Sequence, residues 1–378
     1  MKLKLKNTPE QVELIKAMGS KNAIAAREAQ EAFAAFLGPV VQQVLNQAGT
    51  AAGIYSEAPF DEDDSPSFPL DLYYNQGDNH VNVWSQNVAG GLPSSHVAGM
   101  QELKIATYRL DSAINMLRKY VRRARLDVVS KGVERMAQEI LVKQERNAWA
   151  VLLKALGEAS TGGTGHVIIG SSKDSGAGYF TMEDLNALMT RIRRINESFA
   201  NGTPDVAYSN GLTDLYMSPE RMQDIRGMAY QPMNTRVGPV TAGGGATGER
   251  VPTHGGAIAL PDSVRSEIYN NAGSSEIYGV ALNELNELGA GKKYCTLFGS
   301  YDGTSFHDTN DDLVVGLDNS KGAFIRPVAV QSETGGQVTT LADDQWSARS
   351  DKVGFYASVE EGRVCIDSRA VVGIQIEP

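Results

Sequence analysis

The chain has 378 residues, of which 42% are hydrophobic, so it is too long for one ordinary domain and suits two or three packed lobes. Its net charge of −10 argues against tight nucleic-acid binding, which depends on neutralising phosphates. Its two cysteines are too few for a secreted disulfide scaffold, and we expect free thiols in a reducing compartment. No apolar run follows the N-terminal lysines, so we expect no secretory signal. No run of about 18 apolar residues occurs elsewhere, so we expect a soluble protein without a membrane span.

The charge changes sign along the chain. Residues 1–50 hold six basic and four acidic groups, and residues 51–100 hold seven acidic groups with no Lys or Arg. Residues 101–156 hold twelve basic and six acidic groups. Opposed charge on neighbouring segments favours association between copies of the chain.

The N-terminal region is predicted to form two helices. Thr8-Pro9-Glu10 combines a cap hydroxyl, a proline and an acid, which is typical of a helix start. An alanine-rich stretch over 21–47 has apolar residues at helical spacing, and Pro39 is expected to kink or break it. Two interpretations remain open: the helices pack on the chain's own core, or they form an arm that docks on another subunit.

Residues 48–100 are predicted to form a long two-stranded excursion. DEDDSPS (61–67) is expected to be a solvated acidic linker, and LDLYYN and HVNVWSQNV are predicted strands. Such a hairpin has little of its own to bury, so it needs a surface to lie on.

The clearest predicted element is a helix over 126–156, where apolar residues recur at intervals of three and four. Gly157 is expected to close it. The run KQERN (143–147) interrupts the apolar stripe, and we expect it where the helix emerges from its partner layer.

The next segment alternates helices and strands. Thr181-x-x-Asp184 resembles a capping box for a helix that ends at Asn201-Gly202. Strands are predicted at 205–208 and 215–217, and Ser218-Pro219-Glu220 predicts another helix start.

The final part of the chain is predicted as loop and strand. Residues 233–256 read as loop, and 257–340 as short strands and turns. Three closing strands are predicted, with Glu361-Gly362 as a tight turn: Val353–Val359, Arg363–Asp367 and Ala370–Ile376.

Motifs of enzyme chemistry are weak throughout. Gly163–His166 lacks the third glycine of a dinucleotide fingerprint, and Gly289–Lys293 departs from a phosphate loop. Asp308–Asp312 starts like a calcium loop but continues with Leu313 where glycine is needed. We therefore expect surface loops there, and no catalytic residue, cofactor or metal site.

A basic cluster, Arg118 to Arg125, is the one dense charged feature. Three interpretations remain open: a nucleic-acid contact, a solvated or internally paired face, and a strip that docks the acidic excursion of another subunit.

Three passages, in this order, carry a family resemblance: KIATYRLDSAINMLRKYVRRARLDVVSKGVERMAQEILVKQERNAWAVLLKAL (104–156), TMEDLNALMTRI…DLYMSPERMQDIRGM (181–228) and KVGFYASVEEGRVCIDSRAVVGIQIEP (352–378). Their order and texture resemble the major capsid proteins of tailed double-stranded DNA bacteriophages with the Hong Kong 97-like fold. The resemblance implies an α+β chain that assembles into hexamers and pentamers of an icosahedral head enclosing phage DNA.

By this resemblance the chain divides into an N-terminal arm (1–57), an extended E-loop (58–112) and a peripheral domain with a long spine helix (113–170). An axial domain (171–340) follows, and residues 341–378 return to the peripheral domain and complete its sheet. The glycine-rich part of the axial segment matches the family poorly.

The resemblance also implies partners and a place. We expect the chain to bind itself, a scaffolding protein, a portal and a decoration protein, with packaged DNA held non-specifically. The expected location is the virion capsid, and the host cytoplasm during assembly, with no membrane. Because 51–100 lacks lysine, an isopeptide cross-link from the E-loop is not expected, although Lys104 keeps it open. We further expect an uncleaved subunit.

A specific contact is hypothesised for the assembled shell: the acids of the excursion approach the basic cluster of an adjacent subunit. The acids are Asp71, Asp78 and those at 61–64, and the basic residues are Arg118, Lys119, Arg122, Arg123 and Arg125. The alternative functions are an encapsulin-like cellular compartment on the same fold, a hydrolase or binding protein with an unusual site, and a surface-array or adhesin protein.

Overall fold

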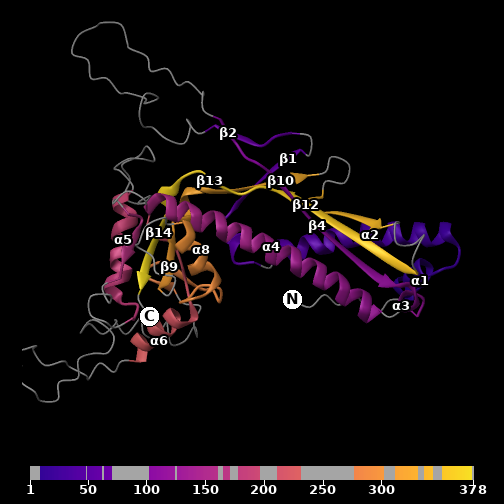
Figure 1. Cartoon of the computed structure of the whole chain (residues 1–378), viewed down its shortest axis with the longest axis horizontal. Coiled ribbons are helices and arrows are strands. Elements are labelled where there is room, and N and C mark those ends of the chain that lie inside the picture. Colours follow the sequence, from indigo (N-terminus) through magenta and orange to yellow (C-terminus); the bar gives the residue numbers. More distant parts are fainter. Residues whose placement is uncertain are drawn as a thin grey trace, which may run out of the picture. The chain divides into compact units, whose positions relative to one another are not determined.

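The computed structural model describes a chain of α+β class (Figure 1). The described residues are 9–47, 49–61, 64–69, 102–123, 126–160, 165–170, 178–195, 211–230, 276–301, 311–330, 336–343 and 351–376. They form two compact units. Unit 1 contains the described residues within 1–72, 98–148 and 324–364, and unit 2 those within 73–97, 149–323 and 365–378.

Unit 1 is built on a six-stranded sheet in the order β1-β10-β12-β11, with β4 also pairing with β12 and β13 with β10. Strands β4 and β12 lie antiparallel over their whole length, from Lys352 opposite Leu117 to Glu361 opposite Tyr108 (Figure 1). The strands are β1 (Ser56–Asp61), β4 (Tyr108–Leu117), β10 (Phe324–Val330), β11 (Thr339–Asp343), β12 (Lys352–Glu361) and β13 (Val364–Cys365).

The N-terminal helices α1 (Pro9–Met18) and α2 (Ala23–Gln47) contribute to the core of unit 1. Ile15 and Met18 of α1 are fully buried, and the ring of Phe33 lies 5.3 Å from that of Phe355 on β12. The buried faces of these helices therefore pack on the chain's own core, as one of the two interpretations expects. Of the two outcomes expected at Pro39, the break is wrong, since α2 continues to Gln47, and the kink stays a prediction. Buried Leu37 and Val41 stabilise the helix on both sides of the proline.

Helix α4 (Leu126–Ser160) confirms the long predicted helix. Its 35 residues correspond to roughly 52 Å at a rise of 1.5 Å per residue. Residues up to Ala148 belong to unit 1, and those from Trp149 onwards belong to unit 2. The predicted end at Gly157 is wrong, because buried leucines of the last turns, including Leu156, outweigh the weak helix preference of glycine.

Unit 2 is built on a second six-stranded sheet, in the order β5-β14-β9-β6-β8-β7. All six residues of β9 and all six of β14 are buried, as expected for strands covered on both faces. The strands are β5 (Val167–Ile169), β6 (Asp214–Met217), β7 (Glu276–Ile277), β8 (Val280–Glu284), β9 (Asp312–Leu317) and β14 (Val371–Ile376). Trp149 of α4 packs beside Tyr216 and stacks on Tyr294, with ring centroids 5.1 and 5.6 Å apart.

Helices α5 (Met182–Ile195) and α6 (Pro219–Tyr230) begin where predicted. At α5 the capping box is confirmed: the Thr181 backbone N–H donates to Asp184 Oδ2 (2.8 Å), and the Asp184 N–H donates to Thr181 Oγ1 (3.2 Å). At α6 the Arg221 N–H donates to Ser218 Oγ at 3.3 Å. The predicted strand at 205–208 and the loop at 233–256 lie outside the described residues.

Helix α8 (Lys293–Tyr301) lies in a segment that the sequence predicted as strands and turns. Its residues include threonine, cysteine, glycine and aromatic residues, all weak helix formers, so the propensity signal is low. Burial of Tyr294, Cys295 and Phe298 stabilises the helix instead.

The closing strands are shared between the two sheets, since β12 lies in unit 1 and β14 pairs with β5 and β9 in unit 2. The C-terminal strands therefore contribute to both sheets, and the return of 341–378 to one domain stays a prediction. Glu361-Gly362 is not a hairpin turn, because both flanking strands pair with β10. A side chain at Gly362 would meet Ile105 and Pro327 at 3.0 Å, which favours glycine at this corner.

The excursion begins and returns as an antiparallel pair. Strand β2 (Ser67–Pro69) pairs with β3 (Glu102–Lys104), with Ser67 opposite Lys104. The acidic linker is shorter than predicted, since Asp61 ends β1 and Ser67 begins β2. The predicted strands LDLYYN and HVNVWSQNV fall outside the described residues.

Candidate functional site

The basic cluster lies on the short helix α3 (Arg118–Arg122) of unit 1. Two of its members are bonded inside the chain. The Arg118 Nε lies 3.8 Å from Asp351 Oδ1, and the Arg122 Nε donates to the Gly19 carbonyl at 2.7 Å. The internally paired interpretation is therefore correct for these two residues.

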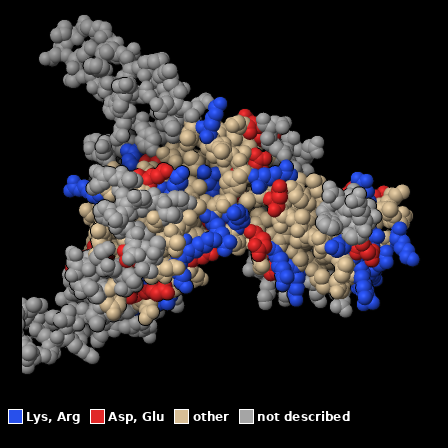
Figure 2. Space-filling view, in the orientation of Figure 1, with Lys and Arg blue, Asp and Glu red and all other residues tan. Residues whose placement is uncertain are grey.

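Lys119 and Arg123 have exposed side chains, and next to them Leu117 and Tyr120 are 47% and 37% exposed. Helix α1 packs on α3, and Lys16 adds a further exposed basic residue there. Figure 2 shows Lys and Arg gathered around this end of unit 1. Such a mixture of cations, an aromatic ring and a leucine is a surface that a protein partner could cover. We call Leu117, Lys119, Tyr120 and Arg123 the α3 surface.

The acids expected to meet this cluster are only partly placed. Asp71, Asp78 and Arg125 lie outside the described residues. Asp61 and Asp64 are exposed, and within the described part of this one chain neither forms an ion pair with α3. The contact with an adjacent subunit stays a prediction.

A second polar cluster, which the sequence analysis missed, surrounds the carboxylate of Glu361. This side chain is fully buried at the end of β12. Arg326 Nε donates to its Oε2 at 2.7 Å, and the Tyr108 hydroxyl donates to its Oε1 at 2.9 Å. Gln144 Nε2 of α4 donates to Oε2 at 3.1 Å, and Arg363 Nε lies 3.5 Å from Oε1.

The same turn of α4 also binds the chain that leads into the excursion. Glu145 accepts hydrogen bonds from the Thr50 hydroxyl (2.9 Å) and the Ala51 N–H (3.1 Å). The Tyr55 hydroxyl donates to the Ala148 carbonyl at 2.8 Å. Arg326 Nη1, in addition to its bond to Glu361, lies 3.0 Å from Glu57 Oε1.

These contacts define the excursion-base network: Thr50, Ala51, Tyr55, Glu57, Tyr108, Gln144, Glu145, Arg326, Glu361 and Arg363. It joins residues 50–57, strand β4 and the middle of α4. The interpretation of KQERN as the point where the helix emerges from its partner layer is wrong, because Gln144 is 3% exposed. A signal existed: Gln144 continues the stripe of Ile140 and Ala148 at four-residue spacing, where a polar residue marks a buried polar contact.

The electrostatics of the network favour a protonated Tyr108 hydroxyl paired with an ionised Glu361 carboxylate. Burial, together with the negative charge of Glu361, raises the pKa of Tyr108 to about 12. The phenol therefore stays protonated and donates to the carboxylate. A carboxylate this deeply buried requires its cationic partners, and removing one partner of such a pair typically costs about 3–5 kcal/mol.

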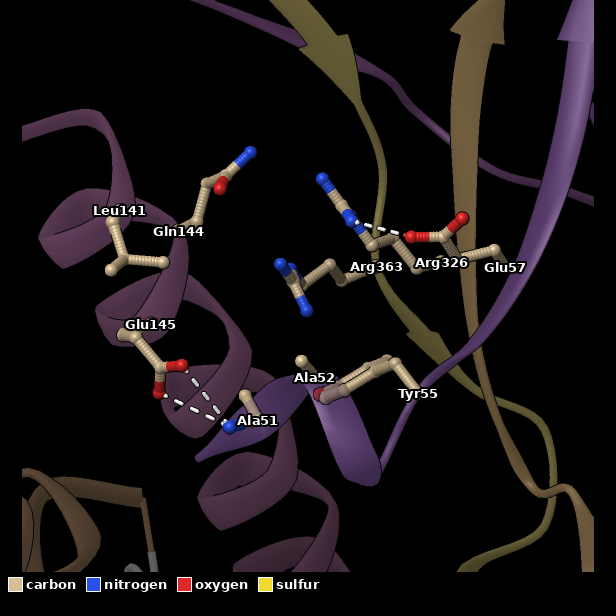
Figure 3. Close-up of a pocket in the computed structure, with 9 residues that line it drawn as sticks. All are labelled: Ala51, Ala52, Tyr55, Glu57, Leu141, Gln144, Glu145, Arg326 and Arg363. Atoms are coloured by element: carbon tan, nitrogen blue, oxygen red, sulfur yellow. Dashed lines mark hydrogen bonds and ion pairs between the residues drawn. The ribbon is translucent and has the colours of Figure 1, made fainter. Parts of the chain in front are cut away.

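A small cavity of about 30 Å³ adjoins the network (Figure 3). The Arg363 guanidinium lies 4.8 Å from the centre of the Tyr55 ring and points into the space between the strands and α4 (Figure 3). A cavity of this size holds water, whereas small-molecule sites usually measure about 300–1,000 Å³. The lining residues are Ala51, Ala52, Tyr55, Glu57, Leu141, Gln144, Glu145, Arg326 and Arg363.

The partial enzyme motifs have structural roles where the structure describes them. Asp312, the last acid of the calcium-like stretch, is buried and accepts from Arg221 Nε at 2.9 Å. Gly289 and Gly291 adopt positive φ in the turn before α8. The two thiols are poor nucleophiles, because burial raises the pKa of Cys295 to about 11 and that of Cys365 to about 12.

Within the described ranges no group of three or more His, Cys, Asp or Glu side chains is arranged to hold a metal ion. None of the helices in those ranges combines the length and apolar character required to cross a membrane.

Comparison with known proteins gave structural matches only. No protein-family model matches the chain, and no curated protein matches it. Among solved structures, the chain is similar to the capsid of cyanophage P-SCSP1u, with 14% identity and a TM-score of 0.48, covering 86% of this chain and 88% of that one. A chain of Microbacterium phage Oxtober96 matches with 10% identity and a TM-score of 0.49, covering 88% and 91%. A virus-like particle from Pyrococcus furiosus matches with 14% identity and a TM-score of 0.43, covering 90% and 98%.

Proposed function

We propose that this chain is the major capsid protein of a tailed double-stranded DNA bacteriophage. It would assemble from identical copies into hexamers and pentamers of an icosahedral head. The observation that carries the proposal is the excursion-base network. A fully buried carboxylate and its partners fix both ends of a long excursion to α4, which is expected of a segment that reaches a neighbouring molecule.

The chemistry of the described residues supports a structural role. The cavity beside Arg363 accommodates water and not a substrate. The Cys295 thiol is buried and the Cys365 thiol is half-buried. Buried ionisable groups are paired within their own unit, as Arg221 is with Asp312 in unit 2.

The structure reduces the number of basic residues that are available for the hypothesised charge contact. Arg118 and Arg122 are occupied inside the chain, so Lys119 and Arg123 of the α3 surface are the groups that would meet the acids at 61–64, Asp71 and Asp78 of an adjacent copy. Arg125 stays in the proposal as a neighbour of this surface. Each such contact is weak, and many repeated contacts would sum by multivalency.

The remaining roles follow from the proposal. The boundaries proposed for the arm, E-loop, peripheral and axial domains are 1–57, 58–112, 113–170 with 341–378, and 171–340. A scaffolding protein, a portal and a decoration protein would be partners during or after assembly. DNA inside the head would be bound without sequence readout, and the chain would reach the virion from the host cytoplasm.

The proposal is tested by expressing the full chain, alone and with a scaffolding protein encoded beside it. Negative-stain electron microscopy and light scattering of the soluble fraction report assembly. Closed polyhedral shells, or rings of five or six copies, are the expected result. A folded monomer that remains monomeric at high concentration in both preparations would overturn the proposal.

A further inference from the structure

Strands β7 and β8 of unit 2 are joined by the tightest kind of hairpin. Ile277 lies opposite Val280, so Tyr278 and Gly279 alone form the loop. Their φ angles are 53° and 77°. Two consecutive positive φ angles in a two-residue loop are the mark of a type I′ turn, in which Asn-Gly is the favoured pair.

Tyr278 is an unexpected residue in this turn. Among the residues that the structure describes it is the one non-glycine with a positive φ. A bulky side chain is disfavoured in the left-handed region, where its Cβ approaches the carbonyl oxygen. The Tyr278 backbone is therefore in a strained conformation that asparagine or glycine would adopt more readily.

The strain at Tyr278 is not offset by burial within this chain. The side chain is 52% exposed, and a Cβ built on the neighbouring Gly279 would meet one atom within 4 Å, the Glu276 Oε1 at 3.9 Å. Backbone strain at an exposed aromatic residue lowers the stability of the isolated folded chain. A phenol ring has an apolar body and a polar tip, and its burial against a partner is a large source of binding energy.

We infer that Tyr278 is a subunit contact, whose ring packs against a second copy of this chain. The inference rests on the proposed function, because it requires many identical copies. In a closed circle of subunits, each copy would contribute its Tyr278 side chain to one neighbour and contact the Tyr278 of the other. A weak single contact would thus be repeated around the symmetry axis.

The chemistry of the hairpin favours a protein partner over nucleic acid. Glu276 belongs to the same hairpin, and residues 276–288 contain no lysine or arginine. A segment without cations cannot neutralise phosphates, which disfavours a nucleic-acid contact. The position at the outermost strand of the sheet, with β7 pairing only with β8 among the described strands, leaves the turn accessible for contact.

The test uses the purified full chain with Tyr278→Asn, Tyr278→Phe and the control Val142→Asn. Val142 is an apolar residue 39% exposed on a different element, α4. Asparagine suits the type I′ turn, so Tyr278→Asn should raise the melting temperature of the unassembled chain. It should also lower the yield of shells or rings by about tenfold or more, as loss of an aromatic contact residue does. Tyr278→Phe and Val142→Asn should assemble at near wild-type yield.

Two results would overturn the inference. One is Tyr278→Asn assembling as well as the wild type, and the other is Tyr278→Asn lowering both the melting temperature and the yield, which would show that the ring serves its own chain. If the wild-type chain assembles neither alone nor with the scaffolding protein, the proposed function fails instead. The two failures are thus distinguishable in one experiment.

Discussion

Gln144, in the middle of helix α4, donates a hydrogen bond of 3.1 Å to the fully buried carboxylate of Glu361 at the end of β12. The two residues are 217 positions apart in the sequence. Their contact joins the helix to β12, the strand that also pairs with β4. The geometry at the base of the excursion therefore depends on this carboxylate.

Replacement of Glu361 by glutamine is expected to destabilise unit 1 by about 3–5 kcal/mol, because Arg326 and Arg363 lose their buried counter-charge. Urea denaturation followed by tryptophan fluorescence and circular dichroism measures the change. The matched control is Glu360→Gln, one residue away, whose oxygen still accepts from the Thr107 hydroxyl. Similar stabilities of the two variants would contradict the importance assigned to the buried carboxylate.

Charge reversal on the α3 surface is expected to impair assembly and leave folding intact. The double variant Lys119→Glu, Arg123→Glu changes exposed side chains, so its free energy of unfolding should shift by less than about 1 kcal/mol. Shell yield by light scattering should fall, most strongly at low salt, where charge contacts are least screened.

Lys154→Glu, at an exposed basic residue on a different helix, α4, is the control for a general effect of charge. Normal assembly of the double variant at physiological salt would remove the charge contact from the proposal. A fall in yield for Lys154→Glu of the same size would do so too.

His166 is expected to make unit 2 acid-sensitive. Burial lowers the pKa of His166 below its ordinary value of 6.5, and its Nδ1 lies 2.9 Å from the Val371 carbonyl oxygen. The unfolded chain therefore binds the proton more readily than the folded chain. Stability should decrease as the pH falls below 6.5 and continue to decrease down to the lowered pKa of the folded state.

Thermal melting between pH 8 and pH 5 measures this effect, and the variant His166→Gln should show a smaller pH dependence over that interval. An equal pH dependence in the variant and the wild type would assign the effect to other groups.

Both thiols are expected to react slowly in the folded protein. The raised pKa values of Cys295 and Cys365 leave little thiolate at pH 8, and both side chains are largely covered. A colorimetric disulfide reagent should label them at least about tenfold more slowly than in denaturant. Fast labelling of one thiol in the native state would show local opening of its unit, and single Cys→Ser variants would identify which.

Local patterns predicted much of the secondary structure. The helix over 126–156, the capping box at Thr181 and the proline starts at Pro9 and Pro219 are local signals, and each marks an element of the structure. Misses occurred where packing overrides propensity. Helix α8 has weak helix formers but buries Phe298, and α2 continues past Pro39 between buried residues.

The polar network was not predictable in full, because its members come from distant segments. Glu361 reads in the sequence as part of a turn, and only the pairing of β12 with β4 places it beside Tyr108. The single local clue was Gln144 on an apolar stripe. The strained turn at Tyr278 was equally hidden, since its signal is a backbone angle.

The pairing of β4 with β12 has a consequence for synthesis on the ribosome. Tyr108 bonds to Glu361, 253 positions later, and β14 in unit 2 pairs with β5, which lies far earlier in the sequence. Neither sheet can be completed before β12 and β14 have left the ribosome, because contacts between distant segments form late. A polypeptide terminated before β12 would lack strands of both sheets, and proteases would degrade it.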